Sequence, residues 1–307
     1  MSDSLKRSRK TLASALNKPS IAKYVSALDF ESRQLIRDLY HEGHAGQTPI
    51  DPFPPSLRLP LSLTLSINWG VRFPTRDMEL YKEMSDINDE AIRYRSTTGG
   101  NLQDYIPILR LNPFSSHSSR ARRLNSRRER VYELLNDGLA ERMASGTAGD
   151  CLQASLWTDK KAPLSPRELR PINFSTMLGG QDVFPPQLAW IIAFLSQHPE
   201  IQQEAYSEIS KIHKLDEGQP LCDAMDDRSC HYVVLLVKEL LRLFTVQRLG
   251  LPHANIEDLS YKGLTIPKGS ITFLNIFACN QGRGEPGGLF ASNLELCDKQ
   301  FSFANSS

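Results

Sequence analysis

Gly179-Gly180-Gln181-Asp182-Val183 is the stretch of this sequence that says most about its fold, because it lies inside a long apolar segment. The spacing predicts one helix that begins at the capping sequence Ser165-Pro166-Arg167-Glu168 and runs to about Gln197. Each glycine costs such a helix about 1 kcal/mol relative to alanine, so the pair indicates that something approaches the backbone. The acid that follows is costly in an apolar helix unless it is paired or used. A packing notch with an exposed Asp182 is the structural alternative.

A second motif, Glu239-Leu240-Leu241-Arg242, lies in an apolar segment over 231–244 that is predicted to be a helix. Acid–base pairs three residues apart are common on helices and usually contribute only roughly 0.2–0.5 kcal/mol. The apolar flanks predict that this pair is buried, and a buried pair survives only when it is well hydrogen-bonded. We therefore expect it to act as a structural lock.

The helical period ends near residue 249. The block Leu249-Gly250-Leu251-Pro252-His253, the turn Ile266-Pro267-Lys268-Gly269 and the apolar run 271–277 predict two or three strands joined by tight turns. Turn chemistry alone explains these glycines and prolines. Further helices are predicted over about 20–40, 77–95, 120–143 and 198–214, with loops over 49–60 and 96–119, whereas 281–300 shows no periodicity. The fold class is therefore mainly α with a small β-sheet.

Composition and charge exclude several classes of protein. The 307 residues carry a formal net charge of +1 and are 40% hydrophobic, which is typical of a globular chain with no global attraction to nucleic acid or anionic lipid. No apolar run approaches the roughly 20 residues that cross a bilayer, and the N-terminus does not resemble a secretory signal. Arginines gather between 120 and 130, where a solvated helix face, with Arg130 near Glu133, is favoured over a phosphate-binding or partner-docking one. The lack of interleaved aromatic residues argues further against single-stranded nucleic acid. They are Arg120, Arg122, Arg123, Arg127, Arg128 and Arg130.

In this order and at this spacing, the three motifs resemble the cytochrome P450 family of haem-thiolate monooxygenases. Residues 179–182 resemble the oxygen-binding groove of that family's central helix, 239–242 its E-x-x-R helix, and 266–269 the turn of its small sheet. Segments 63–71, 101–113 and 277–280 are similar to fungal members of the phenylacetate 2-hydroxylase type. The resemblance implies an incomplete P450 fold, truncated at both ends, that runs from the third helix through the E-x-x-R helix and the following strands. Residues 1–280 would form this partial domain, and 281–307 an irregular C-terminal remnant.

The resemblance also implies how the chain would surround a haem. Arg9 and His253 would contact the propionates, and Asp182 would organise water in the groove that Gly179 and Gly180 open. No metal ligand is assigned, because the family's cysteine lies in an F-x-x-G-x-R-x-C loop. If Phe303 opens that loop, the arginine and the cysteine fall beyond residue 307. Cys297 is a poor substitute, since Glu295 at the arginine position would repel a propionate.

Two other family features are altered. Val183 stands where the family usually has a threonine whose hydroxyl helps to deliver protons, so half of that relay is missing. Glu239 and Arg242 would form the core lock, but the P-E-R-F segment that normally completes it is not found between 281 and 299.

From the resemblance we expect a monooxygenase that uses dioxygen to hydroxylate a small aromatic or secondary-metabolite substrate in fungal metabolism. Its cofactor would be haem, and its partner an NADPH-dependent reductase, because no G-x-G-x-x-G fingerprint is present. Nucleic acid is not an expected partner. The alternative is a catalytically inactive remnant that binds haem weakly or not at all, with an interaction role or none. The expected location is intracellular, cytoplasmic or peripheral to the endoplasmic reticulum, without an anchor.

Overall fold

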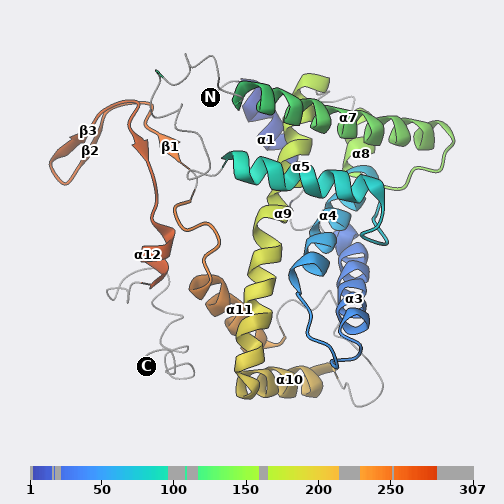
Figure 1. The fold of residues 1–307 in the computed structure, drawn as a ribbon. Coiled ribbons are helices and arrows are strands. Elements are labelled where there is room, and N and C mark those ends of the chain that lie inside the picture. The colour runs from blue at the N-terminus through green and yellow to red at the C-terminus, as the bar shows by residue number, and fades with distance from the viewer. Residues whose placement is uncertain are drawn as a thin grey trace. The chain divides into compact units, whose positions relative to one another are not determined.

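The computed structural model describes residues 3–15, 17, 22–95, 108, 117–158, 165–213, 229–250 and 252–281. The chain divides into two compact units, residues 1–185 and 186–307. Helices dominate the described part of both units, whereas the described strands all belong to the second (Figure 1). The expected fold class, mainly α with small antiparallel sheets, is confirmed.

The first unit consists of helices that the sequence largely predicts. The elements are α1 (Asp3–Ala15), η1 (Ala22–Tyr24), α3 (Val25–Glu42), α4 (Phe53–Trp69), α5 (Glu79–Arg95), α7 (His117–Ala144), α8 (Leu152–Thr158) and the first part of α9 (Pro166–Gln197). The helices predicted over 20–40, 77–95 and 120–143 are confirmed by η1 with α3, by α5 and by α7. The loop expected over 96–119 lies mostly outside the described residues.

The start of α9 is held by the capping residues that the sequence indicated. The Ser165 backbone N–H and hydroxyl both donate to Glu168 Oε2, at 3.0 and 2.8 Å. Arg7 of α1 donates from Nε and Nη2 to Glu168 Oε1, at 3.1 and 2.5 Å. The hydrogen bonds from Arg7, followed by those from Ser165, lower the pKa of the Glu168 carboxyl to about 2. The cap therefore also ties α1 to the beginning of α9.

Acid should weaken this contact. Because the pKa of Glu168 in the folded chain is about 2, below its ordinary value of 4.5, the ionised carboxylate stabilises the fold above about pH 4.5. That contribution is lost as the pH falls towards 2. We expect the free energy of unfolding, measured by urea denaturation, to fall more steeply between about pH 5 and pH 2 in the wild type than in Glu168→Gln. The control Glu204→Gln, on an exposed position of α10 (Pro199–His213), should follow the wild type, and equal slopes for all three proteins would contradict the contact.

The loop predicted over 49–60 is wrong, because α4 already begins at Phe53. Its first-turn prolines are tolerated, since the first N–H groups of a helix have no partner inside it. Asp51 Oδ1, just before the N-cap residue Pro52, accepts the Phe53 N–H at 2.9 Å. Pro60 is the one proline in the interior of α4, where it cannot donate a backbone hydrogen bond. The burial of Leu61 and Leu65 in the core offsets the free energy that this lost bond costs.

The core of the first unit forms where α4, α5 and α7 pack together. Trp69, at the end of α4, is fully buried and meets the ring of Tyr132 edge-on, with centroids 6.1 Å apart. Its indole N–H donates to Asn136 Oδ1 of α7 at 3.0 Å. Phe73 stands in the same cluster and packs edge-on against Tyr81 of α5. Trp69 thus joins α4 to α7, while Phe73, in the segment after α4, packs against α5. The indole also has the polar partner that a buried tryptophan requires.

A buried ionic network, which we call the Arg58 network, links α3 to α4. Arg58 is 0% exposed and Glu31 is 1% exposed. Arg58 donates to Glu31 Oε2 at 2.5 Å and to Asp38 Oδ2 at 2.9 Å. Glu31 Oε1 also accepts from Ser62 Oγ at 2.9 Å and from Arg72 Nε at 3.0 Å. The buried charges of Arg58 and Glu31 are thus paired with each other and with partly exposed partners, Asp38 and Arg72. An unpaired charge at this depth would be very costly.

The second unit combines helices with two short antiparallel strand pairs. Its elements are the rest of α9, α10, α11 (His231–Leu243), β1 (His253–Ala254), β2 (Leu259–Tyr261), β3 (Leu264–Ile266), β4 (Ile271–Thr272) and α12 (Ile276–Gln281). β1 pairs with β4, and β2 pairs with β3 through a turn in which Lys262 and Gly263 both have positive φ. Such a turn matches the twist of the flanking strands. The described β-element thus has four strands rather than the two or three expected.

Candidate functional site

The segment 179–183 lies within one continuous helix. α9 passes through Gly179 and Gly180 and also through Pro185 and Pro186, so the prolines do not end it. The Asp182 side chain is partly buried, and Val183 is 37% exposed. The structure therefore places the five residues in the helical arrangement that the sequence implied.

The Glu239–Arg242 pair forms a two-pronged contact on α11. Arg242 Nε donates to Glu239 Oε2 at 2.8 Å, and Nη2 donates to Oε1 at 2.5 Å. A fork of this kind fixes the direction of the guanidinium as well as its position. The burial that the flanks predicted is wrong, because the two side chains remain 31% and 20% exposed. Leu240 turns inward while Leu241 is exposed, so the apolar residues of α11 do not all face one side.

Arg242 has a second partner that the sequence did not reveal. Its Nη1 donates to the backbone carbonyl of Asn280 in α12. The Asn280 side chain in turn donates to Thr245 Oγ1 at 2.8 Å, and that hydroxyl donates to the Arg242 carbonyl at 3.0 Å. This closed set of contacts, the α11–α12 clamp, holds the chain after the strands against α11.

The clamp predicts the effect of a charge-conserving substitution. Arg242→Lys keeps the positive charge but cannot make the fork and the carbonyl contact together. We expect a loss of about 1–2 kcal/mol in the free energy of unfolding, because hydrogen bonds to charged groups contribute roughly 1.5–3 kcal/mol and this pair is partly solvated. Urea denaturation of Arg242→Lys beside Lys238→Arg, at an exposed position of the same helix, measures the difference. Equal stability of the two variants would show that the clamp contributes nothing.

The two residues expected at the haem propionates lie on exposed surfaces of their own units. Arg9 lies on α1 with an exposed side chain. His253 lies on β1, where its carbonyl accepts from Thr272 Oγ1 at 3.2 Å and its imidazole is exposed. Both side chains are accessible to an anionic group, but their role toward a propionate stays a prediction.

The described cysteines do not fit the role of haem ligand. Cys151 is fully buried in the core of the first unit, Cys230 is the residue before α11, and Cys279 lies in α12. None of them lines a described cavity. Among the described residues there is also no cluster of histidine, cysteine or acidic side chains suited to a metal ion. Cys297 and the segment after Phe303 lie outside them.

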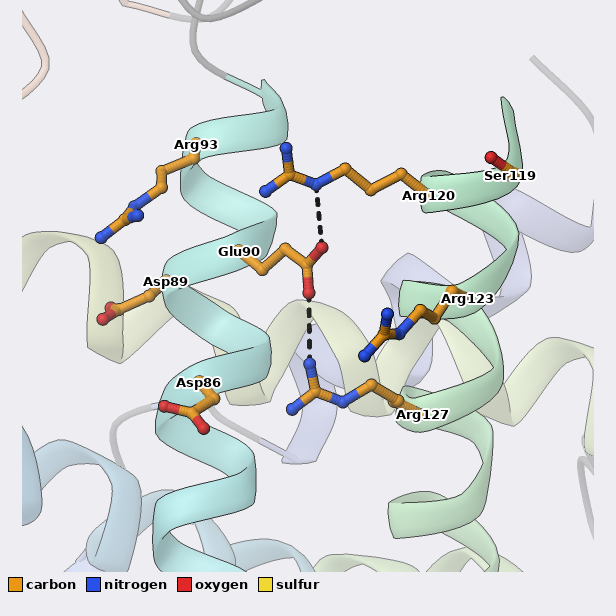
Figure 2. A pocket seen from close by; sticks show the side chains of 8 residues that line it. All are labelled: Asp86, Asp89, Glu90, Arg93, Ser119, Arg120, Arg123 and Arg127. Carbon is orange, nitrogen blue, oxygen red and sulfur yellow. Dashed lines mark hydrogen bonds and ion pairs between the residues drawn. The ribbon is translucent and has the colours of Figure 1, made fainter. Parts of the chain in front are cut away.

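A polar groove of about 690 Å³ is lined by charged side chains of α5 and α7, which lie side by side (Figure 2). Glu90 accepts from Arg120 Nε at 2.9 Å and from Arg127 Nη1 at 3.2 Å. Arg127 also makes a fork with Glu83, at 2.8 and 2.7 Å, and these hydrogen bonds lower the pKa of the Glu83 carboxyl. Two of the arginines that gather between 120 and 130 thus serve to join α7 to α5.

Sequence comparison relates the chain to cytochrome P450 proteins of fungi. Residues 2–283 match the family model described as Cytochrome P450. A 3-hydroxyphenylacetate 6-hydroxylase of Emericella nidulans is 48% identical over 279 residues, which cover 91% of this chain and 53% of that protein. The Cytochrome P450 monooxygenase CYP3 of Mycosarcoma maydis and a phenylacetate 2-hydroxylase of Emericella nidulans are 34% and 33% identical, each over 91% of this chain and 51% and 53% of their own lengths. The chain spans about half the length of these relatives.

None of the described helices is long and apolar enough to cross a membrane.

Proposed function

Because this chain belongs to the cytochrome P450 family, we propose that it takes part in the dioxygen-dependent hydroxylation of a small aromatic acid of the phenylacetate type. The observation that carries the proposal is its 48% identity to a 3-hydroxyphenylacetate 6-hydroxylase over 91% of the chain. The similarity to a phenylacetate 2-hydroxylase supports the same class of substrate.

The described residues would shape the groove on α9, hold a water molecule there and transfer its proton. Because glycine has no side chain, the glycine pair of α9 would let a small molecule approach the helix backbone closely. Asp182, partly buried beside it, can hold a water molecule and pass its proton. The α11–α12 clamp would keep the strands in place.

The cofactor and the redox partner follow from the family. Its members are haem-dependent, and a reductase that oxidises NADPH supplies their electrons. Since no described cysteine fits the ligand role, we assign no step of the reaction to haem in this chain.

The proposal is tested by product analysis. The protein isolated from its native host, supplied with a fungal NADPH-dependent reductase, should convert phenylacetate or a hydroxyphenylacetate into a ring-hydroxylated product. Isotopically labelled dioxygen should place its label in that product. If no labelled product forms from any of these acids although NADPH is in excess, the proposal is contradicted. Omission of the reductase is the matched control.

A second candidate is a non-catalytic form of the same scaffold. The observation that favours it is Val183, whose methyl groups cannot relay a proton next to Asp182. Retained folding without any labelled product would support this candidate.

Restoring a hydroxyl at this position separates the two candidates. In a catalytic protein, Val183→Thr should raise the fraction of consumed NADPH that yields hydroxylated product by roughly 10-fold. A complete proton donor typically contributes at least about 10²-fold, and the expected gain is smaller because Asp182 already supplies part of the relay. Val183→Ala, which removes the methyl groups without adding a hydroxyl, is the control. The partial exposure of Val183 means that both variants should fold like the wild type. Equal yields from the two variants would contradict a proton-relay role for this position.

A further inference from the structure

Two buried carboxamides face one small cavity in the first unit. Asn88 of α5 is 2% exposed and Gln181 of α9 is 4% exposed. Both line a cavity of about 20 Å³. The remaining lining is largely apolar and comes from Met84, Ile87, Val131 and Met177. Apart from Arg128, which also lines the cavity, the two carboxamides are thus set into a hydrophobic wall.

The Asn88 side chain lacks hydrogen-bond partners in the protein. Neither its Nδ2 nor its Oδ1 has a partner, although both atoms are shielded from solvent. A buried donor or acceptor left unsatisfied costs about 1–3 kcal/mol. Buried polar groups in native proteins are nearly always paired with protein or with ordered water. The amide therefore points to an occupant of the cavity.

The size and charge of the cavity select that occupant. A water molecule needs roughly 10–15 Å³ of accessible space and two to four polar partners. The cavity has room for one such molecule and none for an aromatic ring. Asn88 and Gln181 each offer a donor and an acceptor. A cation is disfavoured, since Arg128 also lines the cavity and no carboxylate does.

We propose that this cavity binds one water molecule, hydrogen-bonded to the carboxamides of Asn88 and Gln181. The water joins α5 to α9 one residue after the glycine pair and one residue before Asp182. It therefore fixes the 179–183 segment against α5. This inference does not depend on the proposed function, since it rests on the packing of the first unit.

The test measures the water directly in the full 307-residue chain. A high-resolution crystal structure should show one ordered water within hydrogen-bonding distance of both carboxamides. Water oxygen relaxation dispersion should show one long-lived internal water fewer in Asn88→Leu, which has a similar volume and no polar atoms. Met177→Leu, which changes an apolar wall of the same cavity, should keep the wild-type number.

Three results would overturn the proposal: no density between the amides, an ion in place of the water, or an unchanged number of long-lived waters in Asn88→Leu. If Asn88→Leu does not fold, Gln181→Met replaces it in the relaxation experiment. The wild-type density decides the question in either case.

Discussion

Replacing Glu31 with alanine is expected to lower the free energy of unfolding by about 3–5 kcal/mol, because breaking a buried ion pair leaves an uncompensated charge in the interior. Glu31 is 1% exposed and binds Arg58, Ser62 and Arg72 together. Without it, Arg58 keeps only Asp38 as a carboxylate partner. Urea denaturation followed by circular dichroism measures the loss.

An exposed pair in the same unit supplies the control. Glu42 pairs with Arg76, and both side chains remain substantially exposed. Glu42→Ala should therefore cost no more than about 1 kcal/mol. The double variant Glu31→Met with Arg58→Met should recover part of the stability, since apolar groups of similar volume can replace a buried pair, while the more exposed Asp38 and Arg72 can turn to water. A loss in Glu31→Ala no larger than that in Glu42→Ala would contradict the Arg58 network.

Replacing Trp69 with alanine is expected to cost about 3–5 kcal/mol, which is the typical loss for a fully buried tryptophan. The substitution removes the edge-on contact with Tyr132 and leaves Asn136 Oδ1 without its indole donor. It also opens a cavity between α4 and α7, into which the helices can collapse only in part. The same urea titration measures the effect.

Trp157, at the end of α8, provides the matched control because it is 37% exposed. Trp157→Ala removes an equal number of atoms from a site that solvent can refill, so its cost should be about 1 kcal/mol or less. Similar losses in the two variants would contradict the position of Trp69 at the centre of the core.

Local chemistry explains which elements could be predicted from the sequence. The start of α9 depends on Ser165 and Glu168, which are three residues apart and cap one another whatever surrounds them. The fork between Glu239 and Arg242 likewise follows from helical spacing. Helical periodicity also located α5, α7 and α10.

Long-range packing explains what could not be predicted. Prolines suggested a loop before residue 60, and only the burial of Leu61 and Leu65 shows why α4 forms there. Glu31 lies 27 residues from Arg58 and 41 residues from Arg72 in the sequence, so no local spacing pattern predicts the Arg58 network. The carbonyl of Asn280 that completes the α11–α12 clamp has no sequence signature, because every residue carries one.

The sequence also predicted part of the candidate site, namely the residues that lie close together along α9. The resemblance assigned Gly179 and Asp182 to one groove, and α9 keeps them on one helix. The spacing of Met84, Asn88 and Ala91 could have placed Asn88 on the buried face of α5. Its unsatisfied amide and the cavity beside Gln181 depend on three packed helices and emerge only from the structure.

The carbon monoxide difference spectrum of the reduced protein, isolated from its native host, tests the proposed oxygenase function most directly. The proposal predicts the Soret band that is characteristic of haem with a thiolate ligand, which would have to come from outside the described residues, since no described cysteine fits that role. A protein that has the expected helical circular dichroism but shows no such band would contradict an oxygenase function and leave the non-catalytic scaffold in its place.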